Sequence, residues 1–269
     1  MALKQSDIKY KTSGDEISGY LVHPDDSDKH PGIVLVHAIF GLDGHIRDVA
    51  NRLASEGYVV LAPNLFSSKK LSPVLTQGNI SEAMKFMMSI PPEKQRDSDY
   101  RAKELEKLGP AEKDAVTSVN EALFVHRPVG LFVEYMSFGI DYLKSLKYVS
   151  GKIGSVGFCF GGGMSINLAC TGKTDASIIF YGENPDPVDK VRNVNGPVLG
   201  LYGGEDTRIN SKLDELVKAL AEHKKPFTIR VFPGARHAFF DDTSVQTYNE
   251  AAAKESWKMM LDFFRSSLY

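Results

Sequence analysis

The sequence predicts an α/β fold built on a mostly parallel, twisted β-sheet that is flanked by helices. Short apolar stretches rich in β-branched residues recur along the chain, and longer amphipathic stretches lie between them. This alternation is the pattern of parallel strands joined by helical crossovers. With 269 residues, of which 42% are hydrophobic, the chain can bury a large single core. We therefore expect one domain over residues 1–269.

Six apolar stretches, each followed by turn residues, are predicted to be the parallel strands. They lie at residues 32–36, 58–62, 152–157, 176–181, 198–202 and 227–232. Residues 17–22 alternate apolar and polar side chains, which is typical of an antiparallel edge hairpin. Helices are predicted at residues 46–56, where Gly57 ends the helix, and at residues 249–268.

Residues 67–137 contain no convincing strand and form a predicted helical insertion. Charged and apolar side chains alternate there at helical spacing, and prolines divide the stretch into several helices. Two interpretations remain open. The helices either pack over one end of the sheet, where they would shape access to a site, or merely flank the faces of the sheet.

Charge and composition exclude several classes of protein. Lys and Arg total 32 against 34 Asp and Glu, for a formal charge of -2, and neither sign forms a long block, so nucleic acid is not an expected partner. The first residues lack the apolar core of a signal peptide, and no run reaches the ~18 apolar residues of a membrane helix. We expect a cytoplasmic protein with no membrane partner.

The two cysteines, Cys159 and Cys170, are too few for a disulfide framework and are not spaced as zinc ligands. Both are expected to be reduced. Cys170 lies near the end of a predicted helix, where a small apolar residue packs well, and is interpreted as structural.

The segment Gly157-Phe158-Cys159-Phe160-Gly161 follows a predicted strand and leads into a helical stretch at residues 164–169. Its position and spacing fit GxCxG, the cysteine form of the nucleophile elbow. A sharp strand-to-helix turn strains the nucleophile and crowds its neighbours, and Gly157 and Gly161 relieve that crowding. Cys159 is therefore the predicted nucleophile.

The same turn places Cys159 at a helix N-terminus, where the helix dipole and free N–H groups favour the thiolate. A glycine-rich strand-to-helix turn can instead bind phosphate. Here the turn follows a later predicted strand, at residues 152–157, rather than the first, and Phe158 and Phe160 leave a poor pyrophosphate cradle. We favour the nucleophile.

A cysteine nucleophile needs an imidazole and a carboxylate, which follow it in the chain order acid, then histidine. Downstream of Cys159 only His223 and His237 occur. His223 lies in a polar helix end, whereas His237 lies in the loop after the last strand, so His237 is the predicted base. Asp206 directly follows the strand at 198–202 and is the predicted acid. The competing acids are Glu205 and Glu183.

The oxyanion hole is predicted to use the backbone N–H groups of Phe160 and of Ile39, which lies in the loop after the strand at 32–36. His37 precedes the other triad candidates and is expected to order this loop. The other histidines show no metal-ligand pairing and are interpreted as structural or exposed. They are His23, His30, His45 and His126.

Together these residues resemble the dienelactone hydrolase family of α/β-hydrolases. The segments that carry the resemblance run in the expected order from about Ile33 to the C-terminus: Ile39-Phe40-Gly41, residues 45–49, residues 57–65, residues 157–162, Tyr181-Gly182 and residues 234–239. The resemblance implies an α/β-hydrolase fold and a Cys159, Asp206, His237 triad. It also implies hydrolysis of a lactone through an acyl-thioester, with no cofactor and no metal.

Two positions depart from the family pattern. A glutamate that helps to generate the thiolate commonly precedes the Ile-Phe-Gly triplet, where this chain has Ala38. We therefore expect a Cys–His pair whose proton is not gated by substrate. An arginine that holds the substrate carboxylate commonly follows the catalytic histidine, where Asp241 and Asp242 would repel an anion. The remaining candidates for that contact are Arg96, Arg101 and Arg127.

The expected activity is hydrolysis of a lactone or small ester through a cysteine acyl-enzyme, and the expected partner is that small molecule. Tyr181 and Phe239 are candidate substrate contacts. A thioesterase or general carboxylesterase is the alternative enzyme. A catalytically idle scaffold that binds a small ligand is an alternative from another class, suggested by Ala38. Nothing in the sequence specifies an oligomeric state.

Overall fold

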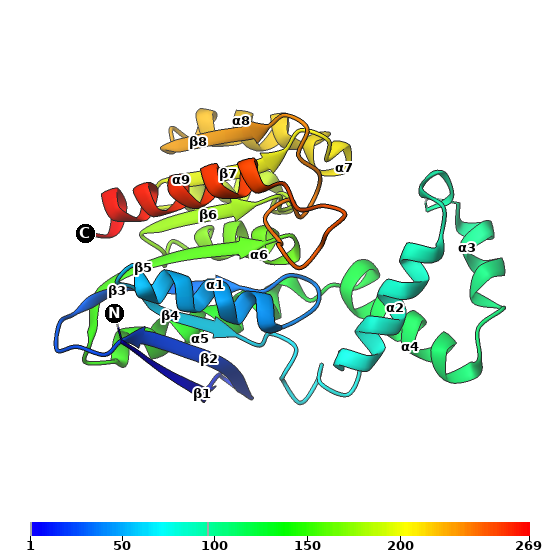
Figure 1. The fold of residues 1–269 in the computed structure, drawn as a ribbon, viewed down its shortest axis with the longest axis horizontal. Helices are drawn as coiled ribbons and strands as arrows, with labels where there is room; N and C mark the ends of the chain where they lie inside the picture. Colours follow the sequence, from blue (N-terminus) through cyan, green and yellow to red (C-terminus); the bar gives the residue numbers. More distant parts are fainter. Residues whose placement is uncertain (1, 96) are drawn as a thin grey trace. The chain divides into compact units, whose positions relative to one another are not determined.

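The computed structural model describes residues 2–95 and 97–269, and its centre is an eight-stranded sheet (Figure 1). The strands are β1 (Leu3–Lys11), β2 (Glu16–Pro24), β3 (His30–Val36), β4 (Val59–Pro63), β5 (Val149–Phe158), β6 (Ala176–Phe180), β7 (Val198–Gly203) and β8 (Phe227–Phe232). Their order is β1-β2-β4-β3-β5-β6-β7-β8. All pairs from β4 to β8 are parallel, and only β2 with its two neighbours is antiparallel within the described chain. The predicted mostly parallel sheet is confirmed.

The antiparallel end of the sheet is the predicted edge hairpin. Residues 17–22 lie in β2, its inner strand, and β1 is its outer strand, paired with β2 from Leu3 opposite Pro24 to Lys11 opposite Glu16. Most side chains of β1 are exposed, and only Tyr10 is buried. The sequence of β1 therefore lacks the alternation that reveals a half-buried strand.

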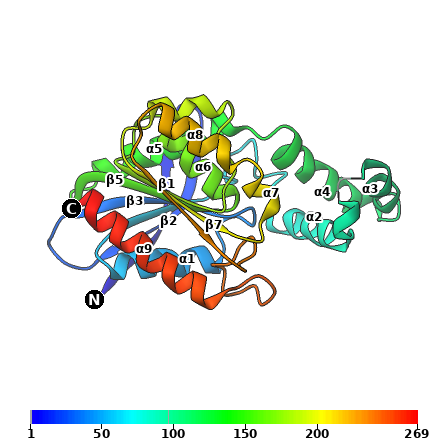
Figure 2. The same ribbon diagram turned by 90° about the horizontal axis from the view of Figure 1, so that it is seen from above.

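Helices cover both faces of the sheet (Figure 2). α1 (Gly44–Ser55) and α9 (Glu250–Leu268) lie on one face, and α5 (Val129–Ser145), α6 (Phe160–Ala169) and α8 (Leu213–Glu222) lie on the other. The short α7 (Thr207–Asn210) and the 3₁₀ turn η3 (Val188–Asn193) complete this part of the chain. Asp43 and Asn249 cap α1 and α9, because their side chains accept N–H groups of the first turn. In the described part of the chain, no helix is long and apolar enough to cross a membrane.

The core beneath α1 and α9 fixes the carboxyl ends of the central strands. Phe158 ends β5 and Phe180 ends β6, and their buried rings lie 4.6 Å apart. Phe240 packs on both rings, with centroids 5.1 Å from each. Each fully buried ring contributes roughly 1.5–3 kcal/mol relative to an exposed one. The loops that follow these strands therefore start from rigid positions.

Residues Phe66–Leu131 form a compact unit distinct from the rest of the chain. It contains α2 (Gln77–Ser89), α3 (Ser98–Leu105) and α4 (Pro110–Asn120), with the 3₁₀ turn η1 (Pro92–Lys94) and the π-turn η2 (Glu121–Val125), coloured cyan to green in Figure 1. Phe86, Ile90 and Val116 form a small core of its own. The unit is helical throughout its regular elements, while its role as a cap stays a prediction.

Candidate active site

Cys159 lies at the sharp turn between β5 and α6, with a left-handed backbone φ of 55°. Its N–H donates to the carbonyl of Phe180 in β6 at 3.0 Å, and its own carbonyl accepts from the N–H of Gly163. A positive φ at a non-glycine residue costs about 1–3 kcal/mol and persists only where the surroundings enforce it. The bonds to β6 and α6 supply that constraint and hold the thiol at the carboxyl end of the sheet.

Gly157 and Gly161 permit this turn because neither position has room for a side chain. A Cβ on Gly157 would lie 2.0 Å from the carbonyl oxygen of Gly161, and a Cβ on Gly161 would lie 2.3 Å from that of Val36. Both distances are far below van der Waals contact. The predicted role of the two glycines is confirmed, and their absent side chains also let the elbow touch the end of β3.

His237 and Asp206 lie beside Cys159. Nδ1 of His237, in the loop after β8, shares a hydrogen bond with the Asp206 carboxylate. Asp206 follows β7, is only 6% exposed, and accepts the N–H of Ile209 at 3.3 Å at the start of α7. Nε2 of His237 is buried without a well-aligned partner among the described residues, and the Cys159 side chain interacts with it. Such contacts are often loose before substrate binds.

The competing acids are placed elsewhere. Glu205 is exposed, and Glu183 accepts a hydrogen bond from Arg208 at 2.7 Å. The rival histidine, His223, pairs with Asp189 at 2.7 Å. Of the three candidate acids, all of them within the described chain, Asp206 is the one that contacts His237.

The charges of the site favour a thiolate and an imidazolium. Burial alone would raise the pKa of the Cys159 thiol, but His237, the Phe160 N–H and the Arg208 guanidinium outweigh burial and lower that pKa. Burial alone would lower the pKa of His237, but its contacts with Asp206 and Cys159 raise that pKa to about 9. Because the two shifts are opposite, they favour the charged thiolate–imidazolium pair over the neutral pair.

The predicted oxyanion donors lie on either side of the elbow. The N–H of Phe160, the first residue of α6, already acts on the Cys159 sulfur. Ile39 lies in the loop after β3 and is 9% exposed. That loop starts at Val36, whose carbonyl lies against Gly161 of the elbow. The two backbone segments that the oxyanion hole requires are therefore adjacent.

His37 orders the loop that carries Ile39, as the sequence predicts. Its Nδ1–H donates to the Ala38 carbonyl at 2.6 Å, and its Nε2 accepts the N–H of Leu65 at 3.1 Å. The side chain is fully buried, and burial lowers its pKa to about 4. His37 therefore stays neutral and bridges the ends of two neighbouring strands.

The two predicted substrate contacts are both buried. Tyr181 lies beside the site, with its ring centroid 5.1 Å from that of His237. Burial, together with the charges of Cys159 and Asp241, raises the pKa of Tyr181 well above its usual value, so its hydroxyl keeps its proton. Phe239 is 0% exposed and packs in the core against neighbouring aromatic rings. A core position explains Phe239 without any substrate.

Arg208 is a site residue that sequence reasoning missed. It lies in the first turn of α7, two residues after Asp206, and its charge acts on Cys159. It is half-exposed and forms an ion pair with Glu183 at 2.7 Å. Its position shortly after the predicted acid could have identified it from the sequence, because the loop after β7 faces the nucleophile.

The arginines considered for substrate binding are engaged within the helical unit or lie outside the described residues. Arg101 donates to the side chain of Asn120 at 3.3 Å, and Arg127 donates to the Leu123 carbonyl at 2.7 Å. Arg96 lies outside the described residues.

The protein has the α/β-hydrolase fold, as its strand order indicates. The elbow follows β5, the acid follows β7 and the histidine follows β8, which is the chain order of this fold. Solved structures share this fold. A "Putative Dienelactone Hydrolase" from Klebsiella pneumoniae aligns with a TM-score of 0.75 at 24% identity, covering 98% of this chain and 99% of that one. An acylaminoacyl peptidase from Pyrococcus horikoshii aligns with a TM-score of 0.66 at 17% identity, covering all of this chain and 42% of that one.

The chain belongs to the dienelactone hydrolase family, whose sequence profile matches residues 17–268. A protein of Saccharolobus solfataricus named "Putative carboxymethylenebutenolidase" is 37% identical over 265 residues, covering 97% of this chain and 98% of that protein. A protein of Synechocystis with the same name is 27% identical, covering 94% and 93%. Membership of this family implies a hydrolase with a small-molecule substrate, and the predicted family resemblance is confirmed.

Proposed function

We propose that this protein is a cytoplasmic carboxylic ester hydrolase that cleaves a lactone or small ester through an acyl-thioester on Cys159, without a cofactor in the chemistry. One observation carries the proposal. Cys159 is strained at the elbow in contact with His237, which Asp206 orients, and the N–H of Phe160 acts on its sulfur. This is the geometry of an activated nucleophile.

Acylation starts from the charged pair. The Cys159 thiolate attacks the carbonyl carbon, and the carbonyl oxygen becomes an oxyanion that the N–H groups of Ile39 and Phe160 hold. When the tetrahedral intermediate collapses, the carbon–oxygen ester bond breaks and the leaving alkoxide takes the proton of His237. The products of this step are an alcohol, which stays attached in a lactone, and an acyl-thioester.

Deacylation returns the enzyme to its starting state. His237, now neutral, takes a proton from water as the water oxygen attacks the thioester carbonyl. The second intermediate expels the Cys159 thiolate and releases the acid, while the proton remains on His237. Asp206 keeps the imidazole in the tautomer that directs Nε2 at the reacting atoms, and stabilises its positive charge.

With Ala38 at the position before the Ile-Phe-Gly triplet, only Cys159 and His237 exchange a proton during activation. In the family a glutamate commonly precedes the Ile-Phe-Gly triplet, but Ala38 has no carboxylate that could exchange a proton with Cys159. The lowered pKa of Cys159 and the raised pKa of His237 supply the thiolate instead. Thiolate formation therefore does not wait for a substrate.

A panel of lactones, p-nitrophenyl esters and acyl-thioesters, tested on the wild type and on Cys159→Ala, separates the proposed functions. A lactone or small ester with the highest kcat/KM, lost in Cys159→Ala, supports the proposal. Preference for acyl-thioesters or for many simple esters would instead assign a thioesterase or a general carboxylesterase. No turnover of the panel, together with slow iodoacetamide labelling of Cys159, would favour a non-catalytic scaffold.

A further inference from the structure

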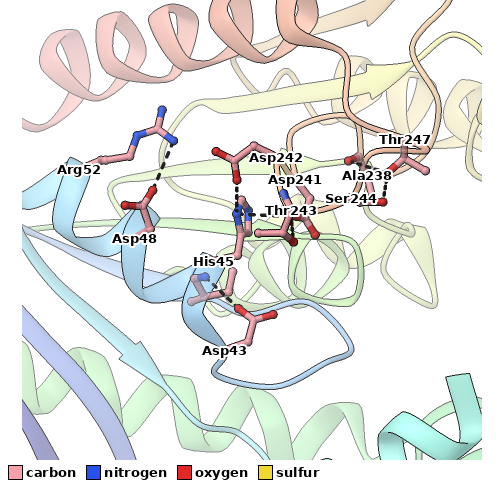
Figure 3. A network of polar contacts seen from close by, with 11 residues as sticks. Asp43, His45, Asp48, Arg52, Ala238, Asp241, Asp242, Thr243, Ser244 and Thr247 are labelled. Carbon is pink, nitrogen blue, oxygen red and sulfur yellow. Dashed lines mark hydrogen bonds and ion pairs between the residues drawn. The ribbon is translucent and has the colours of Figure 1, made fainter.

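A second cluster of chemically active side chains lies outside the triad, where the first turn of α1 meets the segment after His237 (Figure 3). Nδ1 of His45 lies 3.5 Å from Oδ1 of Asp241 and 3.3 Å from Oδ1 of Asp242. One potential ligand atom from each residue lies within 4.8 Å of the others. The sequence shows no metal-ligand pairing for His45, and the structure brings it together with Asp241 and Asp242, which lie almost the whole chain away.

His45 is buried without a hydrogen bond. Its side chain is 7% exposed, and neither ring nitrogen has a hydrogen-bond partner among the described residues. A buried imidazole nitrogen that forms no hydrogen bond costs about 1–3 kcal/mol. Nδ1 faces the two carboxylates at distances too long for good hydrogen bonds. The imidazole of His45 therefore faces two carboxylate acceptors without forming a hydrogen bond to either.

The distances between the His45 nitrogen and the two carboxylate oxygens fit ligands around a metal ion better than direct hydrogen bonds. Around a tetrahedral Zn²⁺ with bonds of about 2.0–2.1 Å, ligand atoms lie about 3.3–3.4 Å apart. The two distances from Nδ1 of His45, 3.5 Å to Asp241 and 3.3 Å to Asp242, lie close to that separation and exceed the ~3.0 Å of an octahedral Mg²⁺ site. An imidazole nitrogen with two carboxylate oxygens is a donor set of first-row transition metals.

The surroundings hold the ligands in place. The rings of Phe158 and Phe240 each pack in a T-shaped arrangement with the His45 ring, with ring centroids 6.2 Å apart in both pairs. The N–H and the hydroxyl of Thr243 both donate to Oδ1 of Asp241, at 3.0 and 2.6 Å, and these bonds fix the orientation of the carboxylate. Asp242 is 52% exposed at its side chain, so an ion can enter from solvent.

Arg52, the cationic side chain drawn with the cluster in Figure 3, contacts other groups. Arg52 pairs with Asp48 at 3.8 Å and lies over the ring of Trp257 at 4.1 Å (Figure 3). It therefore does not neutralise the two carboxylates through a direct ion pair in the described structure. A divalent cation would do so and would also bond Nδ1 of His45.

We infer that His45, Asp241 and Asp242 bind a divalent transition-metal ion of the Zn²⁺ type, with water as the fourth ligand. The ion joins the start of α1, which follows the loop that carries Ile39, to the segment that carries His237. Its role is structural, because it clamps two segments that build the active site without touching the reacting atoms. This inference does not depend on the proposed ester hydrolysis.

Calorimetric titration of ZnCl₂ into chelator-treated protein tests the site directly. The protein carries Cys159→Ser, because a thiolate is itself a zinc ligand. We expect one Zn²⁺ per chain, binding at least tenfold more weakly in Asp242→Asn and in His45→Gln. Co²⁺ in place of Zn²⁺ should give the intense visible absorption of a tetrahedral ion, and saturating Zn²⁺ should raise Tm by about 5 °C.

Two matched variants control the titration. Asp262→Asn removes an exposed carboxylate of α9, and His126→Gln removes an exposed imidazole, and both should leave the affinity unchanged. The inference is overturned if no Zn²⁺ binds up to ~1 mM, or if Asp242→Asn binds Zn²⁺ as tightly as its parent. Because Asp242 is half-exposed, that variant decides the question even if His45→Gln does not fold.

Discussion

Cys159 combines burial with a stabilised negative charge, and this combination separates it from Cys170. Burial raises the pKa of Cys170 to about 12, so that thiol keeps its proton at neutral pH. At Cys159 the same effect is outweighed by His237, the Phe160 N–H and Arg208. The two cysteines, eleven residues apart on one helix, therefore differ in reactivity because of the charges that face them.

The pH dependence of iodoacetamide labelling should show this difference. Labelling requires the thiolate, so its rate rises as pH passes the pKa of Cys159. We predict a single labelled site whose midpoint lies below that of an ordinary thiol. In His237→Ala the midpoint should move upward, because burial then acts without its opposing cation. Rate measurements with peptide mapping check both shifts, and equal midpoints in the two proteins would refute a charged pair.

Asp206 and Glu205 provide a matched pair of substitutions. Asp206→Asn removes the acceptor that fixes the tautomer of His237, so we predict a fall in kcat of about 10³–10⁴-fold. Glu205→Gln changes an exposed neighbour that does not contact His237 and should leave kcat within about twofold. Steady-state kinetics on one ester measure both. Equal effects of the two substitutions would mean that Asp206 does not orient the base.

At the scale of elements, the elbow depends on the close approach of β3, β5 and α6. Gly161→Ala would place a methyl group 2.3 Å from a carbonyl oxygen of Val36, so the backbone must move. We predict a loss of unfolding free energy of about 3 kcal/mol or more and a loss of activity. Gly130→Ala in α5 has open space around it and should be neutral or slightly stabilising. Urea unfolding compares the two variants.

Local patterns made most of the fold predictable, and the same patterns predict the triad. The elbow is formed by consecutive residues around Cys159, so it can be recognised as a sequence motif. Asp206 and His237 can be located because each lies in a loop directly after a predicted strand. β1 escaped prediction because its exposed side chains leave no period of two. The cluster of His45 with Asp241 could not be predicted from the sequence, because the packing of distant segments, rather than a motif, brings these side chains together.

At the scale of the whole molecule, α9 closes one face of the sheet and so supports the central strands. Phe264 of α9 is fully buried, and its ring lies 5.9 Å from that of Tyr58. We predict that Phe264→Ala lowers the unfolding free energy by about 3–5 kcal/mol, because it leaves a cavity in the core. Phe263→Ala, at the partly exposed neighbouring position, should cost clearly less. Chemical denaturation measures both, and equal losses would contradict this account of the core.

The central claim is that the whole fold presents Cys159 as a nucleophile that becomes acylated. Rapid quenching of the reaction with a p-nitrophenyl ester, followed by intact-protein mass spectrometry, observes that species. The account predicts a transient mass increase of one acyl group on Cys159, with a burst of p-nitrophenol, and neither signal in Cys159→Ala. Undiminished ester turnover by Cys159→Ala, or an acyl group located on another residue, would contradict it.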